Sequence, residues 1–282
     1  MIMSPITMPV SFISGFEYNR IVWICGLPPN ERGPSVRVLE DLSILAAQAQ
    51  LGLTIHEPTS RFEFEGYLFA ESLRNAPPLI HIDSHGDSEG ISVGTNNERI
   101  SWKAVCDAIR PINAKFGNRA LVISNCCFSM YAIFAISILQ ATPFQGFLGP
   151  TDELKVKEFE RSTLKFYQTL LDKNDFTQAL AQLKGYDFWL ADQFLLQTLA
   201  GFMKRQAIGK GKERFIEELV SKSRASGKSL LTDSVSIPRT QIKNLFNEKT
   251  GPEMLESHIK RFLFGQRPEF TYEDLLRLAR EA

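Results

Sequence analysis

The chain has 282 residues, of which 44% are hydrophobic, and it carries 32 basic and 32 acidic residues. Its length allows a substantial core, built as one large domain or as a domain with an appendage. Because the charges balance, the composition provides no general attraction to nucleic acid or to an anionic membrane.

Strand and helix patterns alternate along the first part of the chain. The strand patterns are apolar runs rich in β-branched and aromatic residues, and the helix patterns repeat apolar residues at helical spacing. The predicted strands are 20–26, 53–57, 79–84, 118–125 and 142–150. The predicted helices are 36–52, 62–74, 102–117, 128–140, 152–172 and 176–185, and residues 88–101 are predicted to form a hairpin with its turn at Asn96 and Asn97.

Strands joined by helical crossovers predict an α/β domain whose mostly parallel sheet is covered on both faces. From about residue 186 onward the patterns are all helical, so we expect a domain at 1–185 and a helical C-terminal extension at 186–282. Sites in open parallel sheets form at the carboxyl ends of the strands. Two such ends, after Ser84 and after Asn125, carry reactive side chains.

The first of these ends lies in the segment IHIDSHGDSEG, which places His81, Asp83 and His85 at alternate positions. Alternate residues of a strand share a face, so the three side chains could bind a metal, as in manganese-dependent ureohydrolases, whose ligand pattern is similar. A binuclear site needs a second acidic cluster, and the sequence contains no Asp-x-Asp. The metal hydrolase is therefore the weaker of two interpretations.

The second interpretation is a cysteine nucleophile. Cys126 and Cys127 follow the predicted strand 118–125 and precede a predicted helix, whose unsatisfied N–H groups would favour a thiolate. His85 would come from the carboxyl end of another strand. Gly86 has no side chain, so its N–H could approach a substrate carbonyl and, with the N–H of the nucleophile, form an oxyanion hole.

These motifs carry a resemblance. A strand that ends in His-Gly, followed by a strand that ends in Asn-Cys-Cys-Phe-Ser, is similar to the caspase-like cysteine peptidase superfamily and, within it, to the bacterial CHAT-like branch. The resemblance covers roughly residues 18–185. It implies a three-layer α/β/α fold with a mostly parallel central sheet, and thiol protease activity that needs neither a metal nor an organic cofactor.

Aligning NCCFSM with the family's Asp-Ala-Cys-Phe-Ser-Gly motif makes Cys127 the nucleophile, whereas a register one residue earlier selects Cys126. We favour Cys127 because Phe128 and Ser129 then match as well. By the resemblance, His85 assists proton transfer, and the N–H groups of Gly86 and Cys127 bind the oxyanion.

Two positions are candidates for substrate binding. Relatives that cleave after Lys or Arg often carry an acidic residue two positions before the nucleophile, where this chain has Asn125, so a preference for basic substrates is in doubt. Asp83 could line the substrate pocket, orient His85 or cap a loop. Met130 replaces the family's usual glycine.

The resemblance implies a protein substrate and is compatible with a regulatory protein partner in a bacterial defence or cell-death system. The alternative from another class is a catalytically inactive caspase-like interaction module. The basic stretches 203–214 and 221–229 could contact a partner or a nucleic acid, be sites of cleavage, or be solvated loops.

The sequence also predicts a location. The N-terminal segment has no basic leader and contains Pro5 and Pro9, which makes it a poor signal peptide. The best apolar run, 130–140, is shorter than the roughly 18–20 residues that cross a bilayer. Zinc-finger or disulfide spacing is not found among the four cysteines, Cys25, Cys106, Cys126 and Cys127. We therefore expect a cytoplasmic protein that does not associate with membranes.

Overall fold

The computed structural model describes residues 18–206, 213, 217 and 250–281. These residues belong to two compact units, divided between Ala191 and Asp192. The basic stretch 221–229, most of the stretch 203–214 and most of residues 207–249 of the expected helical extension lie outside the described residues.

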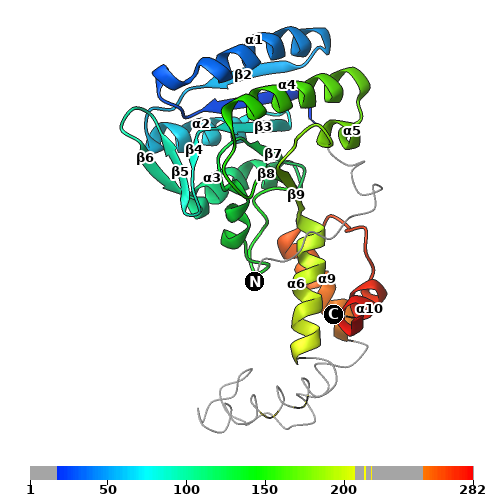
Figure 1. The fold of residues 1–282 in the computed structure, drawn as a ribbon. Coiled ribbons are helices and arrows are strands. Elements are labelled where there is room, and N and C mark those ends of the chain that lie inside the picture. Colours follow the sequence, from blue (N-terminus) through cyan, green and yellow to red (C-terminus); the bar gives the residue numbers. More distant parts are fainter. Residues whose placement is uncertain (1–17, 207–212, 214–216, 218–249, 282) are drawn as a thin grey trace. The chain divides into compact units, whose positions relative to one another are not determined.

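A six-stranded sheet forms the centre of the first unit (Figure 1). Its strands are β1 (Arg20–Cys25), β2 (Gly52–His56), β3 (Pro78–Asp83), β7 (Leu121–Ser124), β8 (Gly146–Pro150) and β9 (Tyr186–Leu190). They lie in the order β2-β1-β3-β7-β8-β9, and every neighbouring pair is parallel except β8 and β9. The predicted α/β class with a mostly parallel sheet is confirmed.

The edge strand β9 corrects the sequence analysis, which assigned residues from 186 onward to helices. Tyr186–Leu190 pairs with β8 in antiparallel register, Phe147 lying opposite Trp189. The chain therefore completes the sheet before it leaves the first unit, and the division into units falls after Ala191 instead of after residue 185. Tyr186, Asp187 and Phe188 are only half-buried, as suits a sheet edge.

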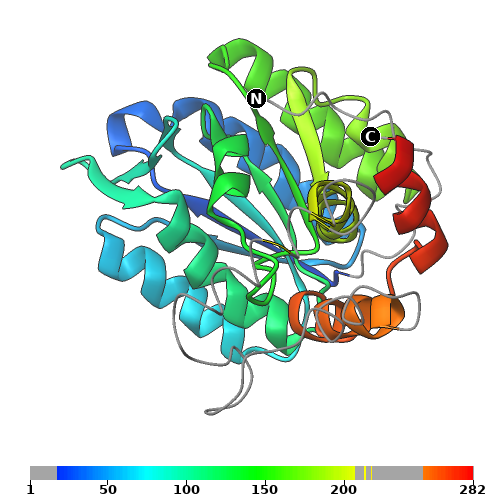
Figure 2. The ribbon, with the colours of Figure 1, turned by 90° about the horizontal axis from the view of Figure 1, so that it is seen from below.

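Helices cover both faces of the sheet, and Figure 2 shows the sheet between the two layers. On one face lie α1 (Gly33–Gln48), α4 (Val156–Lys173) and α5 (Phe176–Leu180), and on the other lie α2 (Arg61–Leu73) and α3 (Trp102–Lys115). Ser60 and Ser101 precede α2 and α3, and each side chain accepts a hydrogen bond from the third backbone N–H of its helix.

Both faces of the sheet bury apolar side chains. Toward α1 and α4, Trp23 and Ile123 pack in a continuous core with Phe166. The intervening residues of the same strands, such as Val22 and Val122, are also fully buried. Strands buried on both faces carry unbroken apolar runs, and this is why the sequence pattern identified them.

A small antiparallel sheet lies beside the end of β3. It consists of β4 (His85–Gly86), β5 (Gly90–Val93) and β6 (Glu98–Ser101), so the predicted hairpin is present with one further short strand. Asn97 has a φ of 50°, the left-handed conformation that asparagine tolerates in turns. This sheet carries His85 directly after the main sheet ends.

The described part of the second unit is helical, as predicted for the extension. It contains α6 (Ala191–Gln206), α9 (Thr250–Phe262) and α10 (Tyr272–Glu281). Leu195, Phe262 and Leu275 are fully buried, and the rings of Phe194 and Phe262 pack against each other. Among the described residues, no helix combines the length and apolar character needed to cross a membrane.

Candidate functional site

The candidate site lies at the carboxyl edge of the main sheet, where the loops after β1, β3, β7 and β8 follow strands that are parallel neighbours. The turn after β1 contains the 3-10 helix η2 (Pro29–Glu31), β3 leads to His85 and Gly86, and β7 leads to Cys126 and Cys127. Parallel strands end at the same edge, so topology alone brings these loops together.

Gly86 packs directly against the cysteine loop. A Cβ atom built on Gly86 would lie 2.6 Å from the carbonyl oxygen of Cys127 and 2.9 Å from Cβ of Cys126. Both distances are shorter than van der Waals contact, so the two backbones approach each other too closely for any side chain. The His-Gly and Cys-Cys motifs, which are far apart in the sequence, are therefore neighbours in the fold.

Cys127 occupies the corner of a tight turn. The N–H of Ser129 donates to the carbonyl oxygen of Cys126 at 3.2 Å, and Phe128 between them has a φ of 57°. A left-handed conformation is uncommon for a bulky residue and costs free energy, and such conformations cluster at functional sites. The turn leaves the Cys127 side chain half-buried at the edge of the sheet.

Cys126 has the opposite environment. Its side chain is fully buried, and its sulfur lies 3.9 Å from the carbonyl oxygen of Ile82. Burial raises the pKa of the Cys126 thiol to about 12, so it holds its proton at neutral pH and is a poor nucleophile. The accessible thiol of the two is Cys127, whose role as the nucleophile stays a prediction.

The structure corrects the α-helix expected at 128–140. The structure has a 3-10 helix, η3 (Ser129–Ala135), and Phe128 does not cap it with a side-chain hydrogen bond. A 3-10 helix of seven residues provides a weaker dipole than the longer α-helix that was expected to favour a thiolate. Instead, the Cys127 sulfur accepts a hydrogen bond from the N–H of Leu154, in the loop after β8, at 3.4 Å.

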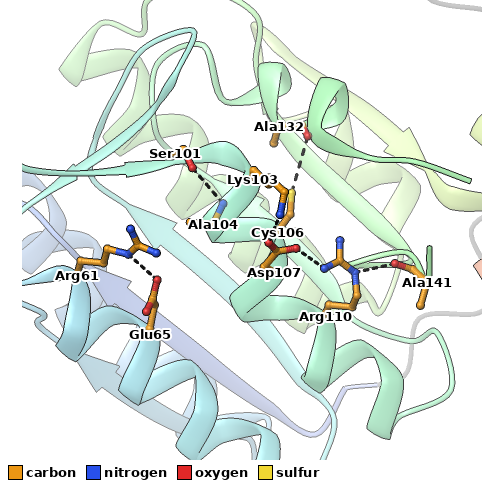
Figure 3. A network of polar contacts seen from close by, with 10 residues as sticks. All are labelled: Arg61, Glu65, Ser101, Lys103, Ala104, Cys106, Asp107, Arg110, Ala132 and Ala141. Carbon is orange, nitrogen blue, oxygen red and sulfur yellow. Dashed lines mark hydrogen bonds and ion pairs between the residues drawn. The ribbon is translucent and has the colours of Figure 1, made fainter. Parts of the chain in front are cut away.

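Helix α3 anchors the segment that follows the cysteines (Figure 3). The thiol of Cys106 lies 3.8 Å from the carbonyl oxygen of Ala132, and Nε of Arg110 donates to the carbonyl oxygen of Ala141 at 2.7 Å. Arg110 also pairs with Asp107 on the next turn of its own helix. These contacts hold the segment after Cys127 against α3 at Ala132 and at Ala141.

His85 is half-exposed, and its Nε2 lies 2.6 Å from a carboxylate oxygen of Glu31. Sequence analysis did not select Glu31, which is a single acidic residue in a Pro-rich turn. The usable signal was its position, since it follows the carboxyl end of β1 and β1 is the parallel neighbour of β3. A carboxylate that accepts from one imidazole nitrogen fixes the orientation of the ring.

Asp83 ends β3 in a buried position and accepts a hydrogen bond from the hydroxyl of Ser35 on α1. Burial raises the pKa of Asp83 to about 6, while the Ser35 hydrogen bond and the proximity of His85 act in the opposite direction. This environment, in which the carboxylate bonds to α1, decides none of the three roles considered for Asp83. Its substrate-binding role stays a prediction.

Asn125 also points into the protein. Its amide nitrogen donates to Nε2 of His81 at 2.6 Å and to the hydroxyl of Thr163 at 3.3 Å, and its oxygen accepts from the hydroxyl of Tyr186 at 2.6 Å. Nδ1 of His81 contacts the hydroxyl of Tyr167 at 2.9 Å, and the ring stacks on Trp23. Asn125 thus joins β3, α4 and β9 directly before the cysteines, and its substrate contact also stays a prediction.

The metal interpretation does not fit this geometry. His81 is buried within the Asn125 network, while His85 belongs to the small sheet and faces Glu31, so the alternation along one strand ends at Asp83. Within the described ranges, no three His, Cys, Asp or Glu side chains are grouped as metal ligands would be. The site offers a half-exposed thiol on the turn that packs against Gly86 and, next to Gly86 in the chain, an imidazole that contacts a carboxylate.

Comparison with known proteins adds no identification. No protein-family model matches the sequence, and a search of curated proteins finds no match.

Proposed function

We propose that the protein is a cysteine endopeptidase in which Cys127 attacks a peptide bond and His85 transfers the proton. The observation that supports the proposal is the contact of Gly86, which follows His85, with the Cys126–Cys127 backbone. Four loops from the carboxyl edge of a mostly parallel sheet surround this pair, as expected of a site in an α/β fold.

The chemistry follows from the residue types. His85 accepts the thiol proton, the Cys127 thiolate forms a bond to the carbonyl carbon, and the oxygen becomes an oxyanion. The proton on His85 passes to the leaving amine as the C–N bond breaks, and water then hydrolyses the acyl-enzyme. Gly86 is the proposed oxyanion donor, because no side chain separates its backbone from the Cys127 turn.

We also propose that the chain belongs to the caspase-like superfamily and, within it, to the CHAT-like branch. The order of the motifs on β3 and β7 and the α/β architecture support it. By that analogy, the substrate is a protein, a regulatory partner controls cleavage, and the setting is a bacterial defence or cell-death system in the cytoplasm. Nucleic acid would act only indirectly.

Cleavage of a peptide library by the purified full-length chain tests the proposal. We expect Cys127→Ala and His85→Ala to abolish cleavage. The matched control is Cys126→Ala, which removes the neighbouring buried sulfur and should retain cleavage. Cleavage that survives Cys127→Ala would contradict the nucleophile assignment, and a wild-type chain that neither cleaves peptides nor reacts with thiol probes would favour an inactive interaction module.

A further inference from the structure

We propose that Glu31 is a positioning residue of this site, which holds the His85 ring through Nε2 and leaves Nδ1 to exchange the proton with Cys127. The inference rests on the proposed function and deepens it, because it extends a Cys–His pair to a Cys–His–Glu arrangement. Its basis is the 2.6 Å contact between Nε2 of His85 and the Glu31 carboxylate.

The contact between His85 and Glu31 contributes little to the stability of the fold. The side chains of His85 and Glu31 are 53% and 44% exposed. An exposed ion pair contributes about 0–1 kcal/mol to stability and is screened by salt. The fold therefore gains little from Glu31. A distance at the short end of the hydrogen-bond range nevertheless restricts the ring to one orientation.

The second observation is that the turn carrying Glu31 is fastened to the segments on either side of His85. The N–H of Gly26 donates to the carbonyl oxygen of Asp83 at 2.8 Å, and the N–H of Gly94 donates to the carbonyl oxygen of Gly26 at 2.8 Å. Asp83 precedes His85 and Gly94 follows β5, so one turn is bonded to both. The relative position of Glu31 and His85 is therefore built into the backbone.

A third contact stiffens the same turn from within. Arg32, directly after Glu31, is largely buried, with its side chain 12% exposed. Its Nε donates to the carbonyl oxygen of Leu27 at 2.7 Å, and its Nη1 pairs with Glu57 at 2.5 Å. The guanidinium thus ties Arg32 to a carbonyl at the start of the turn and to the loop after β2. Glu31 is thus presented from a rigid support, as positioning residues require.

The consequence for the chemistry is specific to the ring nitrogens. A neutral imidazole has one N–H donor and one acceptor nitrogen. If Nε2–H donates to Glu31, the lone pair is on Nδ1, which accepts the thiol proton of Cys127. The ring then carries a positive charge that the Glu31 carboxylate offsets, until Nδ1 returns the proton to the leaving amine.

Two readouts on the full-length chain test the inference. Low-temperature ¹H–¹⁵N spectra report whether the His85 Nε2–H is held in a hydrogen bond, and iodoacetamide labelling reports the reactivity of Cys127. We expect Glu31→Ala to remove the Nε2–H signal and to slow alkylation of Cys127 by about 10- to 100-fold. Glu31→Gln keeps an acceptor, so it should restore the signal and part of the rate.

The matched control is Glu89→Gln. Glu89 is 84% exposed and contacts Arg99 at 3.5 Å, so this variant removes the same charge nearby without touching His85. We expect it to leave both readouts at wild-type values. A Glu31→Ala variant that keeps the Nε2–H signal and the wild-type alkylation rate would overturn the inference. Neither readout requires peptide cleavage. The two readouts therefore still support or refute the role of Glu31 if the peptidase assay fails.

Discussion

Replacing Gly86 with Ala tests whether the His-Gly and Cys-Cys backbones meet as described. The added Cβ would lie 2.6 Å from the Cys127 carbonyl oxygen, about 0.8 Å short of ordinary contact. The obstacle is backbone, so the loop must shift, and overpacking of this kind costs about 1–3 kcal/mol. For a unit of this size, each kcal/mol lowers Tm by about 2–4 °C, so we expect a decrease of about 2–12 °C.

Tryptophan fluorescence is a suitable assay, because Trp23, Trp102 and Trp189 all belong to the first unit. The matched control is Gly66→Ala on α2, where an added Cβ meets nothing within 4 Å. Removing a helix-interior glycine should raise stability by about 0.5–1 kcal/mol. The two alanine variants should therefore shift Tm in opposite directions. A Gly86→Ala variant that melts at or above the wild-type temperature would refute the close approach.

Three further predictions concern the buried polar groups of the first unit. The carboxyl of Asp83 has a pKa of about 6 because burial disfavours its charge. Between about pH 4 and 6 the folded chain therefore holds a proton that the unfolded chain releases. Asp83→Asn should be more stable than wild type at pH 7 and should lose that advantage towards pH 4. Urea titrations at each pH measure the difference. Burial also keeps the pKa of His81 well below its ordinary 6.5. The unfolded chain gains this proton first, so unfolding free energy should fall as pH drops below about 6.5, and His81→Phe should flatten that slope even though it lowers overall stability. A slope unchanged by His81→Phe would contradict the assignment. Glu71 is buried and pairs with Arg20 and His56. Burial raises the pKa of Glu71, but these hydrogen bonds outweigh burial and lower it. Glu71→Gln should therefore reduce the free energy of unfolding by about 3–5 kcal/mol in urea denaturation at pH 7. A loss below about 1 kcal/mol would show that the pair is not buried in solution.

Strands β1, β3, β7 and β8 were predictable because they are buried on both faces and form largely apolar runs. Strand β9 was not, since Tyr186–Leu190 passes into α6 without a turn residue and a short aromatic run fits a strand and a buried helix equally well. The segment after Phe128 was read as an α-helix from its apolar content. The left-handed conformation of Phe128 and the contacts of the following segment with α3 depend on tertiary structure, which local propensity does not encode.

The candidate site also contains features that the sequence could predict and features that it could not. The contact between Gly86 and the cysteine turn could be expected because strand ends in a parallel sheet converge, whereas the catalytic roles of His85 and Cys127 stay predictions. Glu31 carries no periodic or motif signal, and its relevance depends on a turn closed by Arg32. The inward orientation of Asn125 likewise depends on partners from β3, α4 and β9, which only the packed fold assembles.

The most direct test of the account is the site of reaction of an electrophilic peptide that forms a stable bond with an active-site sulfur. Mass spectrometry of the full-length chain after treatment should find one adduct per molecule on Cys127. The adduct should be absent in Cys127→Ala and strongly reduced in His85→Ala, and it should persist in Cys126→Ala. An adduct on Cys25, Cys106 or Cys126, or labelling that is independent of His85, would contradict the proposed Cys127–His85 chemistry.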